Sequence, residues 1–230
     1  MLEQLKELDN SILLTLNGSS SAYWDSVMWI ITKTTTWIPL FLVLLYIVLK
    51  NSDLRRMLFV IVALAVTILL ADRLSSGLIK PIVERWRPTH DATFLHTIDV
   101  VRGYTGGQFG FVSSHAANTF SIFVFVSLLL RSQIASVCLF LWACISSYSR
   151  IYLGVHFPGD ILCGALLGML VGLFVYFLYS FILKRMEGER QYFSTAYTPT
   201  GFQRTDMNLF AFALTLTYCI VLIAAIPMSV

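Results

Sequence analysis

The sequence predicts an all-α polytopic membrane protein, a six-transmembrane-helix bundle with a short N-terminal interfacial helix. Its 230 residues are 57% hydrophobic and only 13% charged, whereas soluble domains are about 45 to 50% apolar and about 25% charged. The mean hydropathy is +0.75. This composition excludes a disordered chain and an ordinary soluble enzyme. We therefore treat residues 1–230 as a single integral membrane domain.

Six apolar stretches carry the prediction, because a helix needs about 20 mostly apolar residues to cross the hydrocarbon core. They run from Ser26 to Lys50, Arg56 to Ile79, Ser114 to Leu130, Ile134 to Tyr152, Asp160 to Leu183, and Met207 to Ile226. Ahead of them, leucines recur at helical spacing between charged residues. This segment is expected either to lie in the membrane interface or to pack against the spans.

Six crossings place residues 80–113 and 152–160 on the same side of the membrane as both termini. The opposite side carries the larger number of cations: Lys50, Arg55, Arg56, Arg131, Lys184, Arg185, Arg190 and Arg204. The positive-inside rule assigns that side to the cytoplasm. The net charge of +3 is spread along the chain without a basic patch, so nucleic-acid binding is not expected.

Charged side chains within or near the membrane are functional candidates. Burying such a charge costs free energy unless it is paired or faces a water-filled cavity. The first group is Lys80 and Arg87, followed by Pro88. A spacing of seven is two helical turns, so both cations would share one face of a helix that Pro88 ends. Snorkelling to the interface would explain either cation alone.

The second group is Ser113, Ser114 and His115, at the start of the third span. Serine caps helix N-termini, where free N–H groups favour an anion. Capping alone would account for one serine. Four preceding glycines, Gly103, Gly106, Gly107 and Gly110, suggest a loop that closes over a ligand.

The third group contains Arg150, His156 and Asp160. A spacing of four could bring the Asp160 carboxylate against the His156 imidazole and raise its nucleophilicity. Alternatively, Pro158 begins a helix that Asp160 caps.

Together the three groups match the chemistry of a phosphate. Three cations and a helix N-terminus would neutralise phosphoryl oxygens, one histidine would attack and the other would protonate the leaving oxygen. The spacing to Asp160 favours His156 as the attacking group, although the residues alone leave the choice open. No carboxylate cluster or His-x-x-x-His pair is available, so we expect no metal and no cofactor.

At this point the sequence resembles the type 2 phosphatidic acid phosphatase superfamily, whose signature is K-x6-R-P, P-S-G-H and S-R-x5-H-x3-D. The first and third blocks match through Lys80, Arg87, Pro88, Arg150 and the His156–Asp160 pair. The second block departs from the pattern, with Val112 in place of proline and Ser114 in place of glycine. We expect these departures to alter loop shape or substrate fit without abolishing the chemistry.

The resemblance implies a phosphohistidine mechanism. His156 would attack phosphorus, Asp160 would orient it and His115 would protonate the leaving group. Lys80, Arg87, Ser113, Ser114 and Arg150 would hold the phosphoryl oxygens, and water would then hydrolyse the intermediate.

The substrate expected from the resemblance is a lipid-linked phosphate, reached from the bilayer on the periplasmic face of a bacterial inner membrane. Lipid A is the leading substrate; undecaprenyl diphosphate and phosphatidylglycerol phosphate are alternatives. Two other functions stay open, a lipid phosphotransferase that uses the same histidine and a transporter that uses the intramembrane charges. The sequence does not indicate an oligomeric state.

Overall fold

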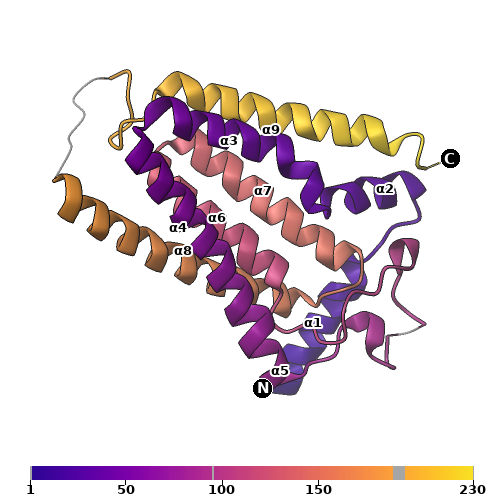
Figure 1. The fold of residues 1–230 in the computed structure, drawn as a ribbon. Coiled ribbons are helices and arrows are strands. Elements are labelled where there is room, and N and C mark those ends of the chain that lie inside the picture. Colours follow the sequence, from indigo (N-terminus) through magenta and orange to yellow (C-terminus); the bar gives the residue numbers. More distant parts are fainter. Residues whose placement is uncertain (1, 95, 189–194, 230) are drawn as a thin grey trace.

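The computed structural model describes residues 2–94, 96–188 and 195–229, and this part of the chain is helical without strands. The chain begins with α1 (Leu2–Leu16) and α2 (Ala22–Ile31). The remaining elements are η1 (Thr34–Trp37), α3 (Ile38–Asn51), α4 (Leu54–Asp72), η2 (Arg73–Ile79), α5 (Lys80–Val83), η3 (Pro88–His90), η4 (Val101–Gly103), α6 (Ser114–Leu130), α7 (Gln133–Tyr152), α8 (Pro158–Glu187) and α9 (Arg204–Ala225). Figure 1 shows the long helices running side by side.

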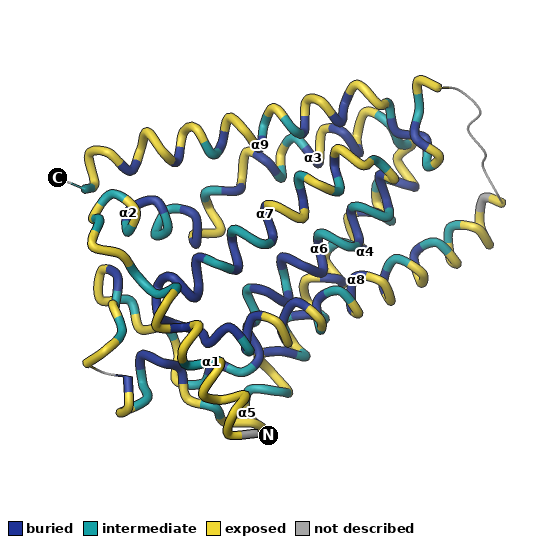
Figure 2. Tube along the Cα trace, turned by 180° about the vertical axis from the view of Figure 1, so that it is seen from behind, coloured by how far each residue is buried: buried dark blue, intermediate teal, exposed yellow. Residues whose placement is uncertain are grey.

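The described residues contain five helical segments long and apolar enough to cross a membrane: Thr34–Asn51, Leu54–Val83, Gln133–Tyr152, Pro158–Met186 and Arg204–Ala225. The shorter apolar helix α6 lies among them. Phe177 of α8 and Ile223 of α9 are among the large apolar residues that are exposed. Figure 2 shows exposed positions recurring along both helices. An outer surface of this kind is stable in lipid, and the chain is an integral membrane protein built as a helical bundle.

The predicted first span, Ser26 to Lys50, is wrong as one continuous helix. Helix α2 ends at Ile31, the backbone of Lys33 is extended, and a 3-10 turn precedes α3. The freed carbonyl groups at the end of α2 are satisfied locally, because Thr36 Oγ1 donates to the Ile30 oxygen (2.6 Å) and Trp37 Nε1 to the Ile31 oxygen (3.0 Å). These polar donors make the break stable.

Helices α6 and α8 approach each other closely. Glycine occurs at every fourth residue of α8, at Gly164, Gly168 and Gly172, and this spacing favours close helix packing. A Cβ atom on Gly164 would stand 2.5 Å from the Ser113 carbonyl oxygen, and one on Gly172 would stand 2.5 Å from that of Ser121. A Cβ atom on Gly168 would overlap the Ala117 carbonyl group. The glycines therefore let the α8 backbone lie against the start of α6, where the candidate site is located.

Helix α1 packs against the ends of α7 and α8, as one of its two expected arrangements requires. Leu13 is fully buried, while Leu5 and Leu8 remain exposed. At the opposite end of the bundle, Lys50 forms an ion pair with Asp206 (2.6 Å). Arg190, one of the cations assigned to that end, lies outside the described residues.

Candidate active site

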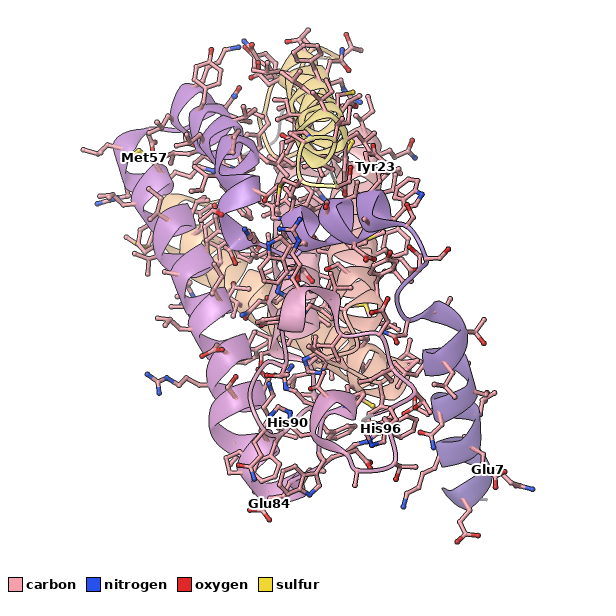
Figure 3. All side chains as sticks on the ribbon, turned by 90° about the vertical axis from the view of Figure 1, so that its right-hand side faces the viewer. Glu7, Tyr23, Met57, Glu84, His90 and His96 are labelled. Atoms are coloured by element: carbon pink, nitrogen blue, oxygen red, sulfur yellow. The ribbon has the colours of Figure 1, made fainter. Side chains whose placement is uncertain are left out.

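Two connecting segments and one helix start meet at one end of the bundle. The connections are the loop from Glu84 to Ser113 and the turn between α7 and α8, and the helix start is that of α6. Figure 3 shows Glu84, His90 and His96 at this end, with Glu7 of α1 beside them. Main-chain hydrogen bonds fix the two sides of the long loop to each other, from Arg87 N to Gln108 O (3.2 Å) and from Gly110 N to Arg85 O (2.8 Å).

The His156 imidazole and the Asp160 carboxylate lie in contact, with Nδ1 and Oδ2 3.3 Å apart. His156 precedes α8 and Asp160 belongs to its first turn, so the pair is formed at a helix start and not within a helical turn. The same Oδ2 accepts from the backbone N–H of Phe157 (3.1 Å). Asp160 thus caps the helix and contacts the histidine at once, and both side chains are buried.

Arg87 lies on the other side of the His156 ring. Its Nη1 is 3.0 Å from His156 Nε2, and the guanidinium also donates to the carbonyl oxygens of Val155 (3.1 Å) and Phe109 (3.2 Å). A guanidinium only donates, so Nε2 must accept. These partners assign the ring proton to Nδ1, facing Asp160, and place the lone pair of Nε2 toward the Arg87 guanidinium.

The predicted alignment of Lys80 and Arg87 on one helix face is wrong. Helix α5 ends at Val83, Glu84 has a left-handed backbone (φ 48°), and Arg87 is extended. Pro88 begins a 3-10 turn and does not end the preceding helix. Arg87 reaches the site because the loop turns back, and not through helical periodicity.

The charges around His156 show that the three groups are gathered at one place. Burial, followed by the positive charges of Arg87, Arg150 and Lys80, holds the pKa of His156 well below its usual range, and His115 acts in the same direction. Burial and the neighbouring Arg150 also lower the pKa of Arg87 to about 10. Arg87 therefore stays charged at neutral pH while His156 is neutral.

Arg150 is held by two residues that the sequence did not single out. Its Nη1 donates to Thr32 Oγ1 (2.7 Å) and its Nη2 to the Tyr104 hydroxyl (3.2 Å). Although burial opposes the effect, Arg150 lowers the pKa of Tyr104. Thr32 lies at the break after α2, so the break in the predicted first span has a place in the site.

Ser113 is the N-cap of α6, and its Oγ accepts from the backbone N–H of Ala116 (3.4 Å). Its own amide is not free as expected, because it donates to the Asp160 carbonyl oxygen (3.0 Å). Ser114 Oγ lies 2.7 Å from Ser76 Oγ. His115 Nε2 is buried and has no hydrogen-bond partner among the described atoms. A buried polar nitrogen without a partner is available to a ligand.

Two of the loop glycines are required by close approach to the site. A Cβ atom on Gly106, which has φ +67°, would lie 2.9 Å from Arg87 Nη1. One on Gly110 would lie 2.8 Å from Asp160 Oδ2 and 3.6 Å from His156 Nδ1. Any larger residue would displace the groups on which the site depends.

Arg85 was also missed, although it lies inside the first sequence block. Its Nη1 donates to Asp160 Oδ1 (2.9 Å) and its Nη2 to Asp9 Oδ2 (2.7 Å). Arg85 stands at one of the unspecified positions of the K-x6-R-P block, so the pattern gave no signal, and Asp9 is 76 residues away in the sequence. Within the described residues, no three His, Cys, Asp or Glu side chains are grouped to hold a metal ion.

Known proteins similar to this chain are membrane lipid phosphatases, in agreement with the phosphatase family that the three sequence blocks indicate. The chain is 35% identical to the lipid A 4'-phosphatase of Bacteroides thetaiotaomicron over 227 residues, which cover 96% of this chain and 97% of that protein. It is 33% identical to the lipid A 4'-phosphatase of Porphyromonas gingivalis over 187 residues, 81% of this chain and 79% of that protein.

Two crystal structures share the fold. Aquifex aeolicus LpxE superposes with a TM-score of 0.54 at 23% identity, covering 73% of this chain and 94% of that one. A transmembrane PAP2-type phosphatidylglycerolphosphate phosphatase from Bacillus subtilis superposes with a TM-score of 0.59 at 21% identity, covering 81% and 90%. The family model of the PAP2 superfamily matches residues 56–184, and the chain belongs to this superfamily.

Proposed function

We propose that this protein is a membrane lipid phosphatase that removes a phosphate from lipid A through a phosphohistidine intermediate. The observation that carries the proposal is the Arg87–His156–Asp160 arrangement, in which the Nε2 lone pair of a neutral, buried imidazole faces a guanidinium. A phosphate that enters beside Arg87 would bring its phosphorus to this nitrogen.

In the first step, Lys80, Arg87 and Arg150 neutralise the phosphoryl oxygens, and the hydroxyl groups of Ser113 and Ser114 donate to them. His156 Nε2 forms a bond to phosphorus while the bond from phosphorus to the ester oxygen breaks. His115 must be protonated for this step. It gives that proton to the departing oxygen and becomes neutral, and Asp160 stabilises the positive charge on the His156 ring.

In the second step, water attacks the phosphorus, His115 accepts a proton from it, and the bond between Nε2 and phosphorus breaks. Inorganic phosphate leaves and His156 returns to its neutral form. Arg87 donates to His156 Nε2 in the resting site and turns to the phosphoryl oxygens when substrate binds.

The choice of lipid A is supported by the names of two relatives that match most of this chain. The location of the site at a bundle end suits a head group whose acyl chains stay in the bilayer. Lys50, Arg55, Arg56 and Arg131 lie toward the other end, which supports a periplasmic site in an inner membrane.

The test is phosphate release from purified lipid A, undecaprenyl diphosphate and phosphatidylglycerol phosphate in EDTA, with wild type, His156→Ala and the exposed-loop control His96→Ala. We expect wild type and His96→Ala to release phosphate from lipid A, and His156→Ala to be inactive yet still in the membrane. Wild-type rates in His156→Ala would refute the mechanism. Preference for another lipid would refute the substrate, and transfer of labelled phosphate to a second lipid would indicate a phosphotransferase.

A further inference from the structure

The two oxygens of the buried Asp160 carboxylate have different partners. Oδ2 accepts from His156 Nδ1 and from the Phe157 backbone, whereas Oδ1 accepts from Arg85 Nη1 at 2.9 Å. A carboxylate held on one oxygen alone could rotate about its Cβ–Cγ bond. Arg85 prevents this rotation and keeps Oδ2 toward the histidine.

Arg85 is itself held from three directions. Its guanidinium lies over the Phe157 ring, 4.0 Å from the centroid, and its Nη2 donates to Asp9 Oδ2 at 2.7 Å. Its backbone oxygen accepts from Gly110, the glycine that touches Asp160. The side chain is 28% exposed, so the guanidinium lies between the buried pair and the surface.

Asp9 ties the N-terminal helix to this arrangement. Its Oδ1 accepts from the Gly159 backbone N–H at 2.6 Å, at the start of α8, while its Oδ2 holds Arg85. One side chain of α1 thus contacts both the cation behind Asp160 and the backbone turn that carries Asp160. The contact is polar and directional, unlike the apolar packing of Leu13 elsewhere on α1.

We propose that Arg85 and Asp9 are positioning residues for the phosphatase reaction, holding the Asp160 carboxylate in the orientation that contacts His156 Nδ1. The inference rests on the proposed function for its kinetic readout. The described hydrogen bonds of these two side chains join Arg85 to Asp160 and Asp9 to Arg85 and Gly159, and none of them reaches His156, so both residues act through Asp160.

Ionisation of the Asp160–His156 pair depends on every charge around it. These are Lys80 from α5, Arg85 and Arg87 from the loop, Tyr104 beside Arg150, His115 from α6, Arg150 from α7 and Asp9 from α1. Among the described groups, Arg85 is the cation hydrogen-bonded to the Asp160 carboxylate. Removing it should therefore move the acid limb of the kcat/KM profile to higher pH, by about one unit.

The experiment compares the pH profiles of wild type, Arg85→Met, Arg85→Lys and Asp9→Asn on the lipid phosphate that wild type hydrolyses. Arg55→Met, at the other end of the bundle, and Glu7→Gln, on the exposed face of α1, are matched controls. We expect about a 10- to 100-fold loss of kcat/KM at neutral pH for Arg85→Met, partial recovery in Arg85→Lys, and about a threefold to tenfold loss for Asp9→Asn. In the double variant Arg85→Met with Asp9→Asn, the loss of kcat/KM should be smaller than the product of the two single losses, because Asp9 acts through Arg85.

A shift of the acid limb separates positioning from loss of folded protein, since a smaller active fraction lowers every rate and leaves the profile in place. The inference would be overturned if the acid limb stays at the wild-type pH in both Arg85→Met and Asp9→Asn. A second readout needs no turnover. In the ¹⁵N spectrum of histidine-labelled protein, His156 should carry its proton on Nδ1 in both proteins, because Arg87 donates to Nε2, and the Nδ1 resonance should move in Arg85→Met as the contact with Asp160 weakens. If wild type hydrolyses no lipid phosphate, the proposed function fails, whereas an unchanged His156 Nδ1 resonance in Arg85→Met would overturn the positioning role separately.

Discussion

Arg87 Nη1 lies 3.0 Å from His156 Nε2, so the cation that would hold a phosphoryl oxygen already contacts the nitrogen that would attack phosphorus. The contact gives the neutral form of the ring a donor for its lone pair, while Asp160 holds the opposite nitrogen. The resting site thus orients the nucleophile before substrate arrives. Preorganisation of this kind reduces the reorientation needed in the transition state.

The role of His115 predicts a dependence on the leaving group. His115→Ala should lower kcat/KM by about 10²- to 10⁴-fold on a lipid phosphate, because the alkoxide then leaves without a proton. On an aryl phosphate such as p-nitrophenyl phosphate the loss should be far smaller, because that leaving group needs no proton. The measurement is the ratio of kcat/KM values for the two substrates in wild type and variant.

His156→Ala serves as the control, since loss of the nucleophile should affect both substrates alike. Equal losses in His115→Ala would contradict its assignment as the acid.

The low pKa of His156 predicts that the protein loses stability in mild acid. A histidine in the unfolded chain takes up a proton near pH 6.5, whereas burial and then Arg87 hold the pKa of His156 well below that value. Below pH 6.5 the unfolded state therefore binds one more proton than the folded state. The free energy of unfolding should fall by about 1.4 kcal/mol per pH unit from this group.

Thermal unfolding in detergent between pH 7.5 and 5.5 measures this effect, and His156→Asn removes the group. The variant should show a shallower decrease of the unfolding midpoint with falling pH. Parallel curves for the two proteins would rule out the assigned ionisation.

Local geometry explains the parts of the predicted site that are formed within a few residues. His156 and Asp160 are four apart, and Ser113 caps the helix that it begins, so local geometry brings these groups together. The Lys80–Arg87 prediction failed because it extended a helix beyond Val83, where the left-handed backbone of Glu84 turns the chain.

The remaining contacts are tertiary and leave no periodic signal. Arg150 and Thr32 are 118 residues apart, and Arg85 and Asp9 are 76 apart. Composition and hydropathy predicted the membrane bundle, because the lipid environment imposes length and apolarity on each span. They did not reveal the break after Ile31, which depends on side-chain donors satisfying two carbonyl groups.

The tight contact between α6 and α8 predicts a destabilising glycine substitution. Alanine normally favours a helix over glycine by about 1 kcal/mol, yet a Cβ atom on Gly168 would overlap the Ala117 carbonyl group. We expect Gly168→Ala to destabilise the protein by about 1 to 3 kcal/mol, as overpacking does. Unfolding in detergent measures this change.

Gly77→Ala is the matched control, because its Cβ atom would meet only Arg73 Cδ at 3.9 Å. It should leave stability unchanged or raise it. A stabilised Gly168→Ala protein would mean that the two helices are farther apart.

A methyl group added at Gly110 should lower the catalytic rate by displacing site residues, without changing any charge. Its added methyl group in Gly110→Ala would lie 2.8 Å from Asp160 Oδ2 and 3.3 Å from Arg87 Cγ, so both side chains must move. A displacement near 1 Å in a reacting group can cost about 100-fold in rate, and we expect kcat/KM to fall by about 10- to 100-fold. Gly107→Ala belongs to the same loop, but its methyl group would meet nothing within 4 Å, and its rate should stay within about twofold of wild type. Equal losses in both variants would attribute the effect to loop flexibility, whereas a loss confined to Gly110→Ala would tie it to the groups around His156.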